Sequence, residues 1–523
     1  MQLISEVLKS AGVPVFRAIP DLIREQATAQ PLSIALRQGA RSVTWLQLDT
    51  MVDRVAATLQ QSDIQPTQAI AICGANSLEY AAVFLGALRA GVAVAPLPVG
   101  ATLPQLATMI ADSGARTVFT DENVPELDAR VTRVALDGLG CATRLQAWLL
   151  PQGARPTPVD IQPHWPFNII YSSGTTGSPK GIVQPHSLRW AQVVRGRSYG
   201  YGPDAVVLLA TSLYSNTTLV PFFAALALGA QVVLSEGRFE AGAYLKLAER
   251  VQATHAMLVP VQYQRLMAYP EFERFDLSSF RLKFCTSAHF PAALKADVLK
   301  RWPGGLLESY GMTEGGGACY LEVHKFPDKL HTVGLPGPGH DIRLIDEAGH
   351  EVARGELGEV VGRSPAMMIG YQNQPAKTSE AEWHDAEGRR YIRTGDIGRF
   401  DEDGFLQIVD RRKDMIISGG FNIYPSDIEA VLREHPGVAE AAVVGVPSET
   451  WGESPVAFVV PAETAPGAAV LREWVNERLG KVQRVLDVWY IEDLPRSEVG
   501  KVLKRRLREL YQLQAATLHG QAV

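Results

Sequence analysis

The sequence has few cysteines and no long uninterrupted apolar run. Its 523 residues contain four cysteines, Cys73, Cys141, Cys285 and Cys319, with no C-x-x-C pair and no metal-ligand spacing. This pattern excludes a disulfide framework and fits a reducing compartment, with the thiols acting as small buried apolar groups. No window reaches about 18 uninterrupted apolar residues, so we expect no transmembrane span.

The sequence also lacks a secretory signal and a strong excess of one charge. The N-terminal MQLISEVLKSAGVP has no basic stretch followed by a long apolar run. Lys and Arg number 50 against 56 Asp and Glu, a net charge of −6, which gives no indication of nucleic-acid binding. We therefore expect a cytoplasmic protein without a nucleic-acid partner or stable membrane insertion. The oligomeric state stays open, with a homodimer as one alternative.

What the sequence does contain is the pattern of a large α/β protein. The composition, 46% hydrophobic and 20% charged, is ordinary for a globular enzyme, and the length predicts about three units of about 150 residues. Short apolar strands alternate with amphipathic helices, which indicates βαβ units and a mostly parallel sheet. The expected strands are 42–45, 69–73, 92–95 (stopped by Pro96), 117–120, 206–210, 231–234 and 256–259, and the expected helices are 19–30, 46–60 and 78–90.

A change of composition near residue 411 predicts a domain boundary. Residues 411–414 form a charged run between two patterned regions. Beyond it, a helix beginning with a capping box of Ser426 and Glu429 is expected, followed by three strands and a second helix. The predicted organisation is a large N-terminal multi-sheet α/β domain (1–410), a hinge (411–415) and a smaller C-terminal α+β domain (416–523).

The first motif is YSSGTTGSPKG at 171–181, with a strand expected on either side. Glycines let backbone N–H groups approach an anion, hydroxyls donate to its oxygens, and lysine adds a mobile positive charge. The motif therefore predicts a polyphosphate site, although a polar hairpin turn has a similar composition. Its spacing differs from that of a P-loop. The predicted phosphate-binding residues are Ser172, Ser173, Gly174, Thr175, Thr176, Gly177 and Lys180.

The second motif, ESYGMTEGGG at 308–317, places an aromatic ring, a hydroxyl and a carboxylate close together. An aromatic face can stack on a purine, a hydroxyl can bond a phosphate oxygen, and a carboxylate can hold Mg²⁺. A glycine-rich loop with an N-capping threonine explains the same residues equally well. The candidate nucleotide-binding residues are Glu308, Ser309, Tyr310, Gly311, Met312, Thr313 and Glu314.

Three later positions carry chemistry that the sequence alone leaves open. Asp396 follows a glycine at an expected strand end, where a carboxylate can bond two vicinal hydroxyls or simply form a turn. Trp451 fits an ordinary core aromatic residue. Lys501 lies in a basic, loop-like segment that also fits the solvated start of a helix.

Taken together and in this order, the motifs resemble those of the acyl-adenylate-forming (ANL) superfamily, which includes acyl-CoA synthetases and peptide-synthetase adenylation domains. The resemblance covers essentially the whole chain. It implies an enzyme that uses ATP, Mg²⁺ and coenzyme A. The implied roles are Tyr310 at adenine, Thr313 at the α-phosphate, Glu314 at magnesium, Asp396 at the ribose hydroxyls, Arg411 at ribose and phosphate, Lys413 as hinge pivot, Gly420 and Trp451 at coenzyme A, and Lys501 as the catalytic lysine.

The resemblance also implies a pocket for the acyl group, and here the sequence departs from the family pattern. Many relatives carry a histidine where this chain has Ser215, and a glycine where it has Ser287. Both departures affect the shape of the pocket, not the adenylation chemistry. The implied pocket residues are Tyr214, Ser215, Asn216, Ala288, Gly315, Gly316 and Gly317.

The function expected from the resemblance is an AMP-forming acid–thiol ligase, an acyl-CoA synthetase acting on an aromatic or medium-chain carboxylic acid. One alternative is a ligase that loads a carrier protein. Against it, the pocket motif lacks the aspartate expected for an amino-acid ammonium group, and Trp451 favours coenzyme A. Another alternative is a nucleotide-binding relative without catalysis, which the presence of Lys180, Glu314 and Lys501 argues against.

Overall fold

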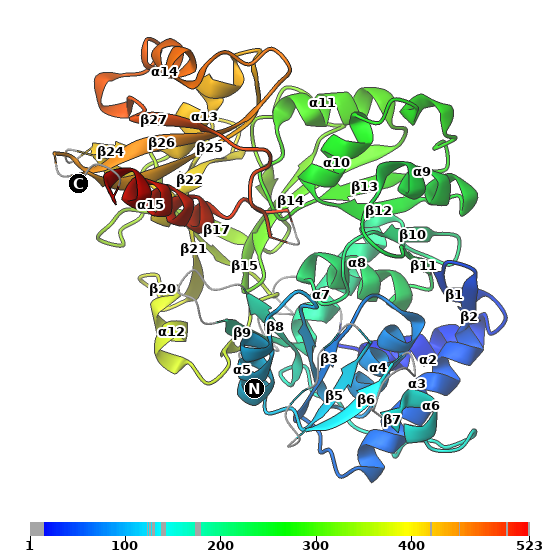
Figure 1. The fold of residues 1–523 in the computed structure, drawn as a ribbon. Helices are drawn as coiled ribbons and strands as arrows, with labels where there is room; N and C mark the ends of the chain where they lie inside the picture. The colour runs from blue at the N-terminus through cyan, green and yellow to red at the C-terminus, as the bar shows by residue number, and fades with distance from the viewer. Residues whose placement is uncertain are drawn as a thin grey trace. The chain divides into compact units, whose positions relative to one another are not determined.

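A computed structural model of the chain describes residues 15–122, 124, 127, 131–136, 143–172, 179–418, 421–448, 450–497 and 500–520. These residues form two compact units, shown in Figure 1. Unit 1 extends to Ile342 and includes Val361–Arg393, and unit 2 combines Arg343–Val360 with Thr394–Val523. By these contacts unit 2 begins before the expected boundary at residue 411, and the hinge at 411–415 stays a prediction.

The first sheet of unit 1 has, among the described residues, the strand order β16-β15-β14-β13-β12-β10-β11-β1-β2. The strands from β14 to β1 in this order are parallel, and β2, β15 and β16 add antiparallel edges. The bounds are β1 Ile34–Gln38, β2 Arg41–Thr44, β10 Val206–Leu209, β11 Gln231–Leu234, β12 His255–Leu258, β13 Leu282–Cys285, β14 Gly305–Met312, β15 Gly315–Glu322 and β16 Leu335–Pro336.

The second sheet of unit 1 has the order β19-β9-β8-β4-β3-β5-β6-β7. Its strands from β8 to β7 are parallel, whereas β9 and β19 are antiparallel to their neighbours. The bounds are β3 Ala69–Cys73, β4 Ala93–Leu97, β5 Thr117–Thr120, β6 Thr132–Ala135, β7 Thr143–Arg144, β8 Pro166–Ser172, β9 Lys180–Pro185 and β19 Gly370–Tyr371.

Helices cover both sheets. The adjacent helices α7 and α8 link them, because α7 contacts β8 and β9 whereas α8 contacts β10 and β11 (Figure 1). The bounds are α2 Ile19–Ala29, α3 Trp45–Gln61, α4 Leu78–Arg89, α5 Leu103–Ser113, α6 Leu145–Trp148, α7 His186–Gly196, α8 Asn216–Ala227, α9 Ala241–Arg250, α10 Pro260–Met267, α11 Ala292–Arg301 and α12 Pro375–Glu380, with 3-10 turns η1 Arg197–Tyr199 and η2 Phe272–Arg274.

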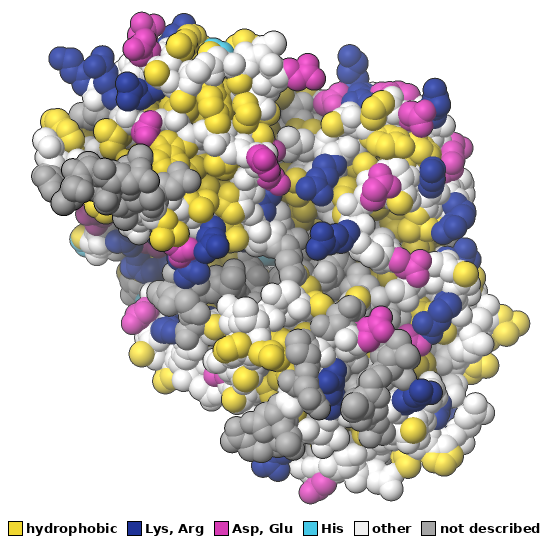
Figure 2. Space-filling model, viewed as in Figure 1, with side chains coloured by type: hydrophobic (Ala, Val, Ile, Leu, Met, Phe, Trp, Pro, Cys, Tyr) yellow, Lys and Arg dark blue, Asp and Glu magenta, His cyan; other side chains and the backbone are white. Residues whose placement is uncertain are grey.

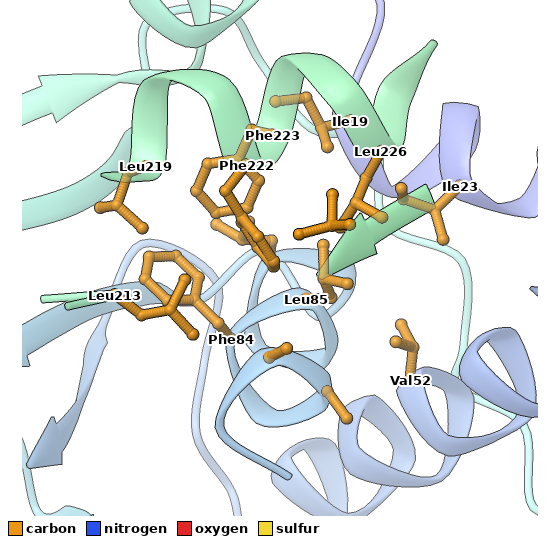
Figure 3. Close-up of a cluster of buried hydrophobic side chains, with 14 of the residues drawn as sticks. Ile19, Ile23, Val52, Phe84, Leu85, Leu213, Leu219, Phe222, Phe223 and Leu226 are labelled. Carbon is orange, nitrogen blue, oxygen red and sulfur yellow. The ribbon is translucent and has the colours of Figure 1, made fainter. Parts of the chain in front are cut away.

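The main core of unit 1 lies where α2, α3, α4 and α8 pack together. Figure 3 shows aromatic rings of α4 and α8 meeting there. The Phe223 ring lies 5.1 Å from that of Phe84 and 4.8 Å from that of Phe167, measured between centroids, in edge-on geometry. Such pairs add about 0.5–1.5 kcal/mol each beyond the burial of their area. This packing fixes α8, whose first turn carries the expected acyl-pocket residues Ser215 and Asn216.

The predicted α/β pattern of the N-terminal region is confirmed, with one correction at a strand end. Pro96 does not stop its strand but lies inside β4, paired with Ile72 of β3. The φ angle of proline is compatible with an extended strand, and the only loss is one backbone donor. Proline is therefore a weaker signal for the end of a strand than the prediction assumed.

Unit 2 contains a sheet of order β24-β23-β26-β25, with β27 parallel to β26. The predicted smaller C-terminal α+β part is therefore present. The two helices and three strands expected there lie within a few residues of their predicted positions, whereas β23, β24 and α15 were not predicted. The bounds are η3 Arg412–Asp414, β23 Ile416–Ser418, β24 Phe421–Ile423, α13 Pro425–Arg433, β25 Val438–Ser448, β26 Gly452–Pro461, α14 Ala468–Asn476, η4 Lys481–Gln483, β27 Asp487–Tyr490 and α15 Lys504–Gly520.

The predicted capping box at the start of α13 is wrong. The N-cap is Tyr424, and Ser426 lies inside the helix, where its N–H donates to Asp410 Oδ2 at 3.0 Å. Glu429 instead accepts from the Val443 N–H at 2.9 Å and pairs with Lys504 Nζ at 2.9 Å. Tertiary partners therefore take up the Ser426 N–H and the Glu429 carboxylate, whereas the buried Ser426 hydroxyl has no hydrogen-bond partner among the described residues.

A further sheet, β17-β18-β21-β20 with β22 beside β21, contains the points at which the chain passes from one unit to the other. The division falls inside three of its strands. The bounds are β17 Asp341–Ile345, β18 Gly358–Arg363, β20 Glu382–His384, β21 Arg390–Phe400 and β22 Leu406–Arg411.

Two surface properties agree with the sequence. Among the described residues, no helix is long and apolar enough to cross a bilayer. On the face seen in Figure 2, basic and acidic side chains are interspersed and do not gather into a broad patch of one sign. This mixed face matches the small net charge of −6.

Candidate active site

The first motif joins two antiparallel strands. Strands β8 and β9 form a hairpin in which Ser172 pairs with Lys180 and Tyr171 with Gly181. The predicted phosphate-binding residues Ser173, Gly174, Thr175, Thr176 and Gly177 lie outside the described residues, as does the Ser172 side chain. Their roles stay predictions. What the structure fixes is Lys180, at the start of β9.

The second motif is also a hairpin, between β14 and β15, with Thr313 and Glu314 at its turn. Gly315 follows with a φ of 87°. A Cβ there would lie 1.8 Å from the Ala366 carbonyl oxygen, so only glycine fits. The alternative of a threonine capping a helix is wrong, because a strand follows the turn. A short hairpin turn allows its residues fewer backbone conformations than an open glycine-rich loop does.

Three hydrogen bonds from other segments hold this turn. Gln184 Nε2 of β9 donates to the Thr313 carbonyl at 2.6 Å, and the Met368 N–H donates to the Glu314 carbonyl at 2.8 Å. The Tyr371 hydroxyl of β19 donates to Glu314 Oε1 at 2.9 Å. Both carbonyls and the carboxylate are therefore fixed by partners outside the hairpin.

Tyr371 also connects Glu314 to the first motif. Lys180 Nζ lies 5.0 Å from the centroid of the Tyr371 ring, a cation–π geometry. Burial, with the nearby Glu314 carboxylate, raises the pKa of Tyr371, so its hydroxyl stays protonated and donates. The sequence reasoning missed this residue, because only the pairing of β19 with β9 brings it here.

The residues of β14 before the turn divide between the interior and the surface. The Glu308 side chain is buried and pairs with the buried Lys295 of α11; burial raises the pKa of Glu308 to about 7, and Lys295 opposes the rise. The Ser309 carbonyl accepts from Thr286 Oγ1 at 2.7 Å, and Met312 packs against an apolar cluster. Tyr310 is half-buried and Gly311 is exposed. The buried contact of Glu308 with Lys295 joins β14 to α11. Nucleotide contacts from the residues of β14 stay predictions.

The expected acyl-pocket residues fall into two groups. Ser215 caps α8 and Asn216 is its first residue. Ser287 has a φ of 83°, rare for a serine, and its hydroxyl lies 2.6 Å from that of Thr217 in α8. The start of α8 and the segment after β13, which includes Ala288, are therefore brought together. Tyr214, next to Ser215, is half-buried.

The three glycines expected in the pocket have close neighbours. A Cβ at Gly317 would lie 1.8 Å from Ile342 Cδ1, and one at Gly316 would lie 3.1 Å from the Gly362 carbonyl oxygen. Together with Gly315 they let β15 pack closely against its surroundings. Packing alone thus accounts for these glycines, and their place in an acyl pocket stays a prediction.

In unit 2, Asp396 and Arg411 are neighbours. They pair across β21 and β22, and Arg411 Nε lies 3.1 Å from Asp396 Oδ1. The expectation of Asp396 at a strand end is wrong, since β21 continues to Phe400. The strand tolerates Gly395 at a φ of 71°, which re-aims the chain just before Asp396. The two residues predicted to hold ribose are thus brought together.

The remaining candidates of unit 2 are exposed or partly buried. Burial, with Arg411 nearby, lowers the pKa of Lys413 in η3. Trp451 is 56% exposed, so its alternative reading as a core aromatic is wrong. Lys501 is exposed, and its N–H donates to Ser497 Oγ at 3.2 Å. Gly420 lies outside the described residues.

A bound magnesium ion requires oxygen ligands, which carboxylate side chains can supply. The described part of the chain holds no cluster of three or more His, Cys, Asp or Glu side chains suited to a metal. Mg²⁺ in nucleotide sites is commonly bound by one or two carboxylates together with substrate phosphates. Glu314, oriented by Tyr371 and close to the first motif through Lys180, fits that requirement.

The chain is similar to known proteins of one family over most of its length. Residues 23–372 match the family described as AMP-binding enzyme, and residues 427–501 match the AMP-binding enzyme C-terminal domain. A feruloyl-CoA synthase from Amycolatopsis sp is 33% identical over 93% of this chain and 97% of its own. An indoleacetate–CoA ligase from Aromatoleum aromaticum is 33% identical over 94% and 98%.

A solved structure extends the agreement to three dimensions. The o-succinylbenzoate CoA synthetase of Bacillus subtilis, in complex with its acyl-adenylate intermediate, is 26% identical and superposes with a TM-score of 0.81 over 94% of this chain and 98% of its own. The chain therefore belongs to the AMP-binding enzymes, the acyl-adenylate-forming superfamily. The enzyme class expected from the sequence, an AMP-forming acyl-CoA synthetase, is confirmed by relatives that match over nearly their whole length.

Proposed function

We propose that the protein activates a carboxylic acid with ATP to an acyl-adenylate and transfers the acyl group to coenzyme A. The observation that carries the proposal is the Thr313–Glu314 turn, fixed from outside the hairpin and joined through Tyr371 to Lys180. A hydroxyl, a carboxylate and an ammonium group are the donors and charges that a nucleoside triphosphate requires. The full-length match to CoA ligases supports the same reaction.

In the first half-reaction an acid oxygen attacks the α-phosphorus of ATP. A new O–P bond forms, the bond to the β-phosphate bridge breaks, and pyrophosphate leaves. The acid is ionised at neutral pH, so no general base is needed. Thr313, Lys180 and Lys501 would supply donors and positive charge where like charges meet. Glu314 would hold Mg²⁺, which when bound neutralises phosphate charge.

In the second half-reaction the thiol of coenzyme A attacks the acyl carbonyl and AMP leaves. We assign Trp451 and Gly420 to this step, since an exposed tryptophan offers a surface to an acceptor. In this assignment Lys501 acts in adenylate formation and Trp451 in thioester formation, and both residues belong to unit 2. A rotation about Lys413, within 411–415, would present each in turn.

For the acid, we propose an aromatic or a medium-chain carboxylate. The first two relatives above are named for ferulate and indoleacetate, both aromatic acids. In this chain the start of α8 and the segment after β13 meet through the hydroxyls of Thr217 and Ser287. These residues would contact the acyl group together with Tyr214 and Ala288.

The test is pyrophosphate release from ATP with benzoates, cinnamates, indoleacetate and short- to medium-chain fatty acids, each with and without coenzyme A. We expect release with some aromatic or medium-chain acids and a thioester only when coenzyme A is present. Pyrophosphate without a thioester would point to loading of a carrier protein. No release with any acid would indicate a relative without catalysis.

A further inference from the structure

A fully buried arginine, Arg189, is linked to the Thr313–Glu314 turn through one side chain, that of Gln184. Arg189 of α7 is 0% exposed, and its guanidinium lies 5.7 Å from the ring centroid of Phe167 and 5.9 Å from that of Phe223. Phe223 is one of the core rings in Figure 3. Burial lowers the pKa of Arg189 to about 9. A charge in such surroundings is costly unless its hydrogen bonds are satisfied.

Neutral amides satisfy these hydrogen bonds. Arg189 Nη2 donates to Asn168 Oδ1 at 2.9 Å, to Gln184 Oε1 at 2.6 Å and to Asn216 Oδ1 at 2.9 Å. Nε also donates to Asn168 Oδ1 at 3.2 Å, and Nη1 donates to Gln192 Oε1 at 3.0 Å. Within the described residues no carboxylate lies at ion-pair distance from Arg189. Amide oxygens carry only the partial charge of a dipole. The Arg189 cation therefore orients the amide side chains around it and does not neutralise a carboxylate.

Gln184 links Arg189 to the Thr313–Glu314 turn through two hydrogen bonds. Its Oε1 accepts from Arg189, and its Nε2 donates to the Thr313 carbonyl, each at 2.6 Å. Hydrogen bonds in such a chain polarise and strengthen one another in a buried site. The peptide that follows Thr313 is trans, so fixing its carbonyl also directs the Glu314 N–H to the opposite side.

Arg189 also bonds to Asn216, a residue of the expected acyl pocket, which is the acid side of the site. Asn216 is the first residue of α8, between Ser215 and the Thr217 that meets Ser287. Gln184 Nε2 also lies 3.4 Å from Asn216 Oδ1. The chain Asn216–Arg189–Gln184–Thr313 thus joins the expected acyl pocket to the turn expected at the α-phosphate.

We propose that Gln184 is a positioning residue for Thr313, and that the buried Arg189 couples the acid side of the site to the phosphate side through it. The inference rests on the proposed function. It requires that the Thr313 turn acts in adenylate formation. If Gln184 had only a structural role, removing its bond to Arg189 would affect activity as much as removing any other bond to Arg189.

Three variants separate these roles. Gln184→Glu keeps an acceptor for Arg189 and makes it an ion pair, but removes the donor to the Thr313 carbonyl. Gln184→Met removes both bonds at similar volume. Gln192→Met is the matched control, because Gln192 also accepts from Arg189 but has no bond to the turn. The readouts are acid-dependent pyrophosphate release, thioester formation from a supplied acyl-adenylate, and the melting temperature.

We expect both Gln184 variants to lose about 10- to 100-fold in kcat for pyrophosphate release, since small misplacements of a reacting group can cost about 10²-fold. Thioester formation should change less than about twofold, because its chemistry does not involve the α-phosphate attack. Gln192→Met should keep both half-reactions, because Gln192 has no bond to the turn.

Two results would overturn the inference: a Gln184→Glu enzyme that releases pyrophosphate at the wild-type rate, or equal losses in Gln184→Met and Gln192→Met. Failure of the proposed function is seen separately and first, as a wild-type enzyme that releases no pyrophosphate with any acid.

Discussion

The Thr313–Glu314 turn of unit 1 differs in exposure from Trp451 and Lys501 of unit 2. The Thr313–Glu314 turn receives hydrogen bonds from Gln184, Met368 and Tyr371. By contrast, Trp451 is 56% exposed and Lys501 is exposed. Preorganised groups lower a barrier because they need no reorganisation during the reaction. Exposed groups on a second unit suit roles that alternate between half-reactions.

The largest effect is expected at Lys501. Lys501→Ala should reduce pyrophosphate release by about 10²–10³-fold, because loss of one charge-stabilising donor typically costs about 2.7–4 kcal/mol. Thioester formation from a supplied acyl-adenylate should change less than about threefold. Arg505→Ala is the control, since Arg505 is another exposed basic residue of this segment. Equal loss in both half-reactions would remove Lys501 from its assigned step.

The second effect concerns Glu308 of β14 in unit 1. The folded chain holds the Glu308 proton more tightly than the unfolded chain, because the pKa of Glu308 rises from 4.5 to about 7. The free energy of unfolding should therefore fall as pH rises through this window, by about 2 kcal/mol, and Glu308→Gln should lack this component. Urea unfolding at pH 5 and 7.5 measures the difference.

The control for that measurement is Glu271→Gln, at a carboxylate that is 48% exposed. It should follow the wild-type pH dependence. If wild type and Glu308→Gln differ by the same amount at both pH values, the proton of Glu308 does not contribute to the stability of unit 1.

The third effect tests the exposed tryptophan. Trp451→Ala should raise the KM for coenzyme A about tenfold, the loss of about 1.4 kcal/mol of stacking on an aromatic surface, and leave the KM for ATP within about twofold. Val470→Ala removes another exposed apolar side chain of unit 2, 58% exposed, and should change neither. An unaltered dependence on coenzyme A would exclude Trp451 from the acceptor site.

The smallest effect is expected at Tyr371. Tyr371→Phe keeps the ring near Lys180 but removes the hydroxyl that donates to Glu314. We expect the Mg²⁺ concentration for half-maximal pyrophosphate release to rise about fivefold, consistent with about 1 kcal/mol for one hydrogen bond. Tyr490→Phe, which loses a bond to the Pro466 carbonyl in unit 2, is the control. Equal Mg²⁺ dependence in both variants would contradict the role of Tyr371.

The enzyme class could be predicted from the order of short motifs. The strand 69–73 and the helix 78–90 follow from periodicity and a C-terminal glycine, because local patterns determine them. Errors arose where a local signal met a tertiary partner. Pro96 continues a strand, and Ser426 donates from its backbone to Asp410 and does not form a capping box.

By itself the sequence determined the family to which the chain belongs, through short motifs whose catalytic roles stay predictions. Their spacing along the chain is short, so composition and turn propensity specify them locally. Only the tertiary structure decided what holds them. Tyr371 and Gln184 reach the turn through the pairing of β19 with β9 and of β9 with β8. Contacts between residues far apart in the chain leave no periodic signal, since they depend on which strands become neighbours.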